Sequence, residues 1–82
     1  MKIINAIKKL QKAGFKIVQN GKFYTAAKDG SSRVIEFHQN GNSDRITSIG
    51  FRYASDHSDP MTDYCAATFC DNLTQAIRHA AL

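Results

Sequence analysis

The dipeptide Asn20-Gly21 constrains the fold more than any other feature of this sequence. It lies between two short segments of strand-forming character, residues 15–19 and 22–28. Asn-Gly favours the positive φ angles of a type I′ turn, whose twist matches the twist of paired antiparallel strands. The pattern therefore predicts a β-hairpin, one face of which needs a covering layer.

Two further turn sequences extend the hairpin into a meander. Residues 29–32 read Asp-Gly-Ser-Ser and residues 40–42 read Asn-Gly-Asn, and both compositions are typical of turns. Residues 33–38 and 45–53, which follow these turns, place apolar side chains at alternate positions, as strands do. Residues 61–70 fit either an irregular crossover or a short edge strand. We therefore expect four antiparallel strands joined by short turns.

An amphipathic helix is predicted over about residues 2–13, before the hairpin. Gly14 supplies its stop, since glycine tolerates the left-handed conformation that ends many helices. Apolar residues fall on one side of a 3.6-residue period and lysines on the other. The apolar side holds Ile3, Ile4, Ala6, Ile7, Leu10 and Ala13, and the opposite side holds Lys2, Lys8, Lys9 and Lys12.

A second helix is predicted near the end of the chain, capped by Asp71 or Asn72. With Asn72 as the cap, Gln75 occupies the position that completes a capping box. The expected inward face contains Leu73, Ala76, Ile77 and Ala80, and the expected outward face contains Arg78 and His79.

These elements predict one α+β domain over residues 1–82, with the order α-β-β-β-β-α. Two amphipathic helices must bury their apolar sides, and the shared face of the meander is the only large surface available to them. We therefore expect a two-layer sandwich with both helices on one face of the sheet. The opposite face is expected to be open as a binding surface, and to display Val18, Tyr24, Ala26, Gly50 and Arg52.

The net charge of +4 conceals an asymmetry between the two parts of the chain. Residues 1–33 hold eight basic side chains against Asp29 alone, whereas residues 34–82 hold three basic side chains against six acids. Such a distribution suits contact with an anionic surface at one end and a basic surface at the other, although lopsided charge is also common on soluble domains. No apolar run reaches the length of a signal peptide or a membrane span, so we expect a cytoplasmic protein with no membrane partner.

The sequence contains no recognisable catalytic or cofactor motif: no Walker loop, dinucleotide glycine pattern or HExxH. Cys65 and Cys70 lack the second closely spaced pair that a structural zinc site normally has, and they are expected to be buried, reduced thiols. His38, which ends a strand, is expected at the rim of the sheet. We therefore predict a protein that is not an enzyme and that needs neither a metal nor a cofactor.

Two charged groups are the candidate contact surfaces. The first is the lysine face of the early helix, Lys8, Lys9 and Lys12, which suits phosphates or an acidic partner but is also what an ordinary solvated helix face looks like. The second is the acidic segment that contains Asp56, Asp59, Asp63 and Tyr64. Its spacing does not match an EF-hand, so we interpret it as a loop that presents charge to a partner.

Residues 10–18, Leu-Gln-Lys-Ala-Gly-Phe-Lys-Ile-Val, resemble the opening of the HicA family of toxin-type mRNA interferases. That resemblance implies a small αβββα domain shaped like a double-stranded-RNA-binding domain. The family places its catalytic histidine just after a glycine in the second strand, and this chain reads Gly21-Lys22-Phe23-Tyr24 there. The resemblance therefore implies an inactive relative.

Residues 59–64 and 71–77 are similar in character to small phage and mobile-element proteins, the anti-CRISPR inhibitors among them. This resemblance implies a non-enzymatic inhibitor that binds a host protein or ribonucleoprotein complex and blocks its access to nucleic acid. An acidic loop can imitate a phosphate backbone in such a complex. The alternative is a small basic module that binds RNA or DNA through the first helix and the adjoining strand. The sequence leaves open whether the protein is a monomer or a homodimer.

Overall fold

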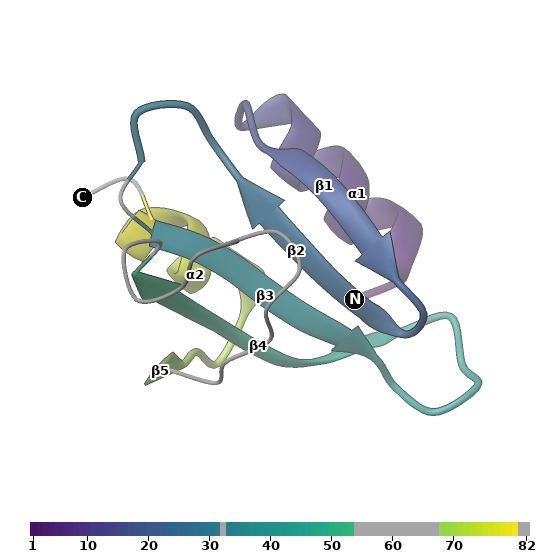
Figure 1. Cartoon of the computed structure of the whole chain (residues 1–82). Helices are drawn as coiled ribbons and strands as arrows, with labels where there is room; N and C mark the ends of the chain where they lie inside the picture. The colour runs from purple at the N-terminus through teal and green to yellow at the C-terminus, as the bar shows by residue number, and fades with distance from the viewer. Residues whose placement is uncertain (32, 54–67, 81–82) are drawn as a thin grey trace.

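The computed structural model describes residues 1–31, 33–53 and 68–80 (Figure 1). The elements are α1 (Ile3–Lys12), β1 (Lys16–Asn20), β2 (Phe23–Ala27), β3 (Arg33–Gln39), β4 (Ile46–Tyr53), β5 (Thr68–Phe69) and α2 (Leu73–Ala80). The strands form one antiparallel sheet in the order β1-β2-β3-β4-β5, which confirms the α+β class and the predicted meander. The edge-strand alternative is correct for the two residues of β5.

The first hairpin forms where predicted but uses a different turn. Asn20 pairs with Phe23, so the two central turn residues are Gly21 and Lys22. Of these, Gly21 alone has a positive φ, of 64°. A type I′ turn needs positive φ at both central residues, whereas a type II′ turn places glycine at the first. The predicted hairpin is thus confirmed and the predicted turn type is wrong.

A bulge interrupts the pairing of β3 with β4. Glu36 pairs with Gly50 and His38 pairs with Thr47, so β4 has one residue more than β3 over this stretch. Ser48 lies in the bulge with φ of 53°, in the left-handed region that disfavours residues with a Cβ atom. The bulge increases the local twist of the sheet.

Both helices pack on one face of the sheet, as predicted, with α1 alongside β1 and α2 behind β3 and β4 (Figure 1). The core lies between the helices and the sheet. Its buried members are Ala6, Leu10, Phe15, Tyr24, Ala26, Ile35, Phe37, Leu73, Ala76 and Ala80.

The opposite face of the sheet differs from the prediction. Tyr24 and Ala26 were expected there, but Tyr24 pairs with Phe37 and stacks on its ring on the helix side, and Ala26 is also in the core. Val18, Gly50 and Arg52 do belong to the opposite face. Its centre is not open, however, since buried residues occupy it: Thr25, Val34, Glu36 and Arg52.

The start of α2 follows the predicted capping logic. The Asn72 side-chain oxygen accepts the backbone N–H of Gln75 at 2.9 Å, which confirms Asn72 as the cap. The Gln75 side chain reciprocates, but it accepts the backbone N–H of Asp71 at 2.8 Å, one residue before the position of a standard capping box.

The end of α2 is held by side chains at the start of β3 and just before it. Ser31 donates its hydroxyl to the carbonyl of Ala80 at 2.7 Å, and the Arg33 guanidinium donates to the carbonyl of His79. Carbonyls in the last turn of a helix have no partner within the helix, so these bonds satisfy them. The outward orientation predicted for His79 is wrong, because its ring stacks on Phe51 with centroids 4.8 Å apart.

Within the residues that the structure describes, no helix has the length and apolar character needed to cross a membrane.

Candidate functional site

Some cationic side chains form hydrogen bonds or ion pairs with other described residues, and others do not. Lys22 donates to the Asn42 side chain at 2.9 Å, and Lys9 donates to the Thr74 hydroxyl. Lys2 pairs with Asp44, with 3.7 Å between Nζ and Oδ2. Such bonds do not stop a lysine from binding another anion, but they do fix where its charge lies.

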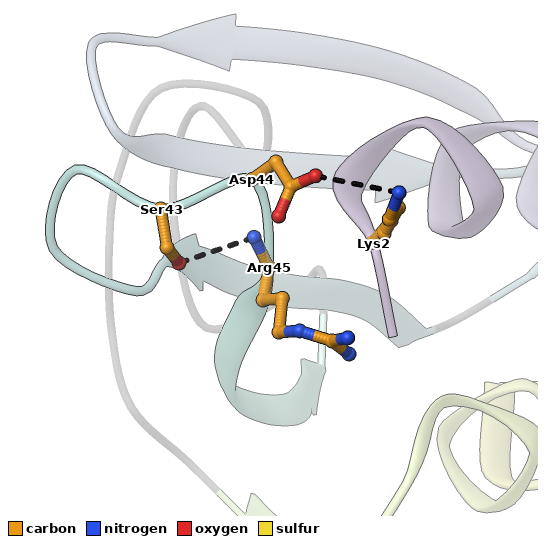
Figure 2. Close-up of polar contacts among 4 residues, drawn as sticks. All are labelled: Lys2, Ser43, Asp44 and Arg45. Atoms are coloured by element: carbon orange, nitrogen blue, oxygen red, sulfur yellow. Dashed lines mark hydrogen bonds and ion pairs between the residues drawn. The ribbon is translucent and has the colours of Figure 1, made fainter.

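Lys2 and Asp44 join the start of α1 to the β3–β4 turn (Figure 2). The neighbouring backbone bonds support this junction: Ile3 N–H donates to the Asp44 carbonyl at 2.7 Å, and the Ser43 hydroxyl accepts the Arg45 N–H at 3.2 Å. Both charged side chains are exposed, and exposed ion pairs contribute about 0–1 kcal/mol. Asp44 thus offsets the charge of Lys2 but not that of the neighbouring exposed Arg45, so this junction keeps a net positive charge.

The remaining α1 lysines face outward. Lys8 and Lys12 are exposed and lie one helical turn apart, about 6 Å along the axis. No described side chain forms an ion pair or hydrogen bond with either. The sequence of α1 contains no acidic residue to neutralise them. Their charges therefore remain available to a ligand.

Lys9 extends this charge toward the second helix. Its side chain is half-buried, and its bond to Thr74 places the flank of α1 that contains Lys9 next to α2. Arg78 is one turn beyond Thr74 on the same side of α2, and it is exposed. The sequence of α2 also lacks acidic residues. Arg78 thus adds an exposed cation on the side of α2 that Lys9 contacts through Thr74.

We call this surface the basic helix layer and define it as Lys8, Lys9, Lys12 and Arg78. Sequence reasoning found the three lysines but missed Arg78, because the residue lies in the part of the chain with net negative charge. The bond between Lys9 and Thr74 is the contact that relates Arg78, one turn further along α2, to the α1 lysines. The one sequence signal that pointed to it was its predicted outward position on the last helix.

Two predicted contact residues belong to the fold instead. Tyr24 is 4% exposed and packs in the core, and Arg52 is 1% exposed and forms an ion pair with Glu36. Removal of one member of a buried ion pair typically costs about 3–5 kcal/mol. Neither side chain offers a surface to a partner in this structure. The predicted acidic loop, with Asp56, Asp59, Asp63 and Tyr64, lies outside the described residues.

The described residues offer little for catalysis or metal binding. They contain no group of three or more His, Cys, Asp or Glu side chains arranged to hold a metal ion.

Burial raises the pKa of the Cys70 thiol, and the neighbouring Asp71 carboxylate raises it further, so the reactive thiolate is disfavoured. Cys70 is half-buried against the core, close to the buried position predicted for it, whereas Cys65 lies outside the described residues. His38 is half-buried, with its ring centroid 5.5 Å from that of Phe23.

Comparisons with protein-family models, with curated proteins and with solved structures return no match for this chain.

Proposed function

We propose that the protein is a non-enzymatic module that binds the phosphate backbone of RNA or DNA through the basic helix layer. The observation that carries this proposal is the bond from Lys9 to Thr74, which links the lysine face of α1 to the side of α2 that contains Arg78; neither helix contains an acidic residue. Lysine and arginine side chains bind phosphates and release condensed counterions, which drives association without any reading of sequence.

The arrangement suits backbone contact better than base recognition. Base reading in a groove relies on bidentate Arg, Asn or Gln side chains. The basic helix layer has one arginine and three flexible lysines, and lysine acts on phosphate as a point charge. The protein should therefore bind nucleic acids of unrelated sequence with similar affinity.

The first test is the salt dependence of binding to random-sequence RNA and DNA duplexes, followed by fluorescence anisotropy. Four phosphate contacts predict a slope of about −3.6 in a plot of log affinity against log salt concentration. Affinity should then fall by roughly 150-fold between 50 and 200 mM salt. Absence of binding at the lower salt concentration, or a slope near zero, would refute the proposal.

Two double variants that each remove two positive charges test whether the basic helix layer is the binding surface. Lys8→Gln with Lys12→Gln removes two charges from the basic helix layer and should reduce the magnitude of the slope by about two. Lys16→Gln with Lys22→Gln removes the same charge from elsewhere, since Lys16 is on the sheet face opposite the helices and Lys22 is in the hairpin turn. Equal loss of binding in both double variants would show that net charge, rather than the helix layer, attracts the nucleic acid.

The inhibitor of a host defence complex stays a second proposal. The unequal distribution of charge along the chain favours it, because a basic helix layer also complements an acidic protein surface. Pull-down from a host lysate with nuclease treatment separates the two proposals. A protein partner retained after nuclease treatment, together with no binding to free nucleic acid, would support the inhibitor and exclude the nucleic-acid module.

A further inference from the structure

The two edges of the sheet are protected to different extents. On the β4–β5 side, the start of β4 is covered by the N-terminal residues, since Ile46 N–H donates to the Met1 carbonyl at 3.0 Å and Lys2 forms a β-bridge with Arg45. Further along β4, Gly50 and Phe51 pair with β5, which is only two residues long. At the other edge, β1 pairs with β2 alone among the strands that the structure describes. It is five residues long, with no proline and no bulge, so it lacks the usual protections of an edge strand apart from a terminal lysine.

The hairpin register shows which backbone groups of β1 are unused. The pair Asn20 and Phe23 closes a two-residue turn, and such a pair exchanges hydrogen bonds. Hydrogen-bonded and non-bonded pairs alternate along antiparallel strands. Val18 therefore bonds to β2, whereas the N–H and C=O groups of Ile17 and Gln19 point away from the sheet. No described residue outside the strand ladder bonds to these groups.

The side chains on either side of this edge include exposed apolar residues. Helical periodicity places Ile4 and Gln11 on the flank of α1 opposite Lys9, which bonds to α2, and α1 runs alongside β1 (Figure 1). Ile4 is 59% exposed, and on the other face of the sheet Val18 is 39% exposed. A strand added to β1 would cover both.

We propose that the β1 edge binds an acidic, extended peptide segment of a partner protein by strand addition. Four backbone bonds to Ile17 and Gln19 would hold the segment, apolar side chains would cover Ile4 and Val18, and carboxylates would lie near Lys8 and Lys16. The positive charge around β1 favours an acidic peptide over a second copy of this chain. Residues 1–33 carry eight basic side chains and one acid, so two copies joined at β1 would bring like charges together. The site does not depend on the proposed binding of nucleic acid.

The probe is the eight-residue peptide Glu-Glu-Val-Val-Glu-Glu-Val-Val, titrated into the ¹⁵N-labelled protein and followed by NMR. Because alternate side chains of a strand point to opposite faces, this pattern presents both glutamate and valine on each face of the added strand. Without peptide, the amides of Ile17 and Gln19 should exchange with solvent faster than that of Val18. With peptide, those two amides should shift and become protected. A lysine–valine peptide should bind at least about tenfold more weakly, because each of two lysines then changes from attraction to repulsion.

The matched variants are Gln19→Pro and Gln19→Ala. Proline removes the outward N–H and is compatible with an edge strand at a position not bonded to its neighbour, so the fold should survive. Binding should fall about tenfold or more in Gln19→Pro and stay near the wild-type value in Gln19→Ala, which keeps the N–H. Wild-type affinity in a folded Gln19→Pro protein, no response of the Ile17 and Gln19 amides to the acidic peptide, or concentration-dependent dimerisation through β1 would each overturn the proposal.

Discussion

Substitution of Gly50 by alanine tests how closely β5 packs on β4. Gly50 pairs with Phe69 across the β4–β5 ladder. A Cβ atom at Gly50 would lie 2.7 Å from the backbone carbonyl oxygen of Thr68, whereas ordinary van der Waals contact begins at 3.4 Å. Because the obstacle is backbone, no side-chain rotation relieves the clash. The substitution must therefore either strain the ladder or push β5 away.

The loss of stability in Gly50→Ala is set by whichever response costs less free energy, strain in the β4–β5 ladder or displacement of β5. Overpacking in a rigid site costs about 1–3 kcal/mol. Displacement of β5 loses the bond from Cys70 N–H to the Ile49 carbonyl, now 2.8 Å, and the short ladder beside it, at about 1 kcal/mol for each bond. Alanine recovers about 0.5–1 kcal/mol over glycine within a strand. We expect a net loss of about 1–2 kcal/mol in the free energy of unfolding, or about 4–8 °C in Tm for each kcal/mol.

Urea unfolding gives the free energy, and amide exchange identifies the mechanism. In Gly50→Ala the Cys70 amide should exchange faster even where exchange of the central β3 amides is unchanged. Gly41→Ala is the control: its φ of 57° imposes a left-handed penalty, but no atom lies within 4 Å of the new Cβ. It should lower stability by about 1 kcal/mol without selective exposure of Cys70. Unchanged stability and unchanged Cys70 exchange in Gly50→Ala would refute the packing described for β5.

Three further changes test local features of the fold. Ser48→Gly should raise the free energy of unfolding by about 1 kcal/mol in urea titrations, because glycine relieves the left-handed φ of the bulge. Asn72→Ala should lower it by about 1 kcal/mol through loss of the α2 cap, whereas Asn72→Asp should retain most of it. In a Cys65→Ser background, Cys70 should react with iodoacetamide only at higher pH than it does in the unfolded chain. The stability that its raised pKa contributes should be present below the ordinary thiol pKa and lost as pH rises through the folded value. Identical alkylation profiles for folded and unfolded protein, or no change in stability for either of the other variants, would contradict these assignments.

Local sequence patterns were sufficient for most of the secondary structure. The 3.6-residue period and Gly14 predicted α1 to within a residue at each end, because an amphipathic stripe and a left-handed stop are encoded by neighbouring residues. The Asn-Gly and Asp-Gly turns likewise located the strands between them. The type II′ turn was missed, since the choice between turn types depends on which residue becomes the first central position, and the pairing register decides that.

The side of the sheet on which β2 residues lie was not predictable from alternation. Phe-Tyr-Thr-Ala-Ala has bulky or apolar residues at every position, so both assignments fit the pattern. Pairing of Tyr24 with Phe37 places it on the helix side. The prediction of an open sheet face was also wrong. Local periodicity does not show that Glu36 and Arg52, which are far apart in the sequence, form an ion pair and are buried.

The sequence by itself determined the element order, the hairpin and the lysine face of α1, since each depends on residues within about one or two turns of one another. The tertiary structure decided which charges lie together and which backbone groups remain unused. Arg78 is related to the α1 lysines because Lys9 bonds to Thr74, 65 residues further along the chain. The edge at β1 is open because the strand order places β1 at the border of the sheet. Contacts between residues distant in sequence depend on how complete faces pack, and no local pattern encodes that packing.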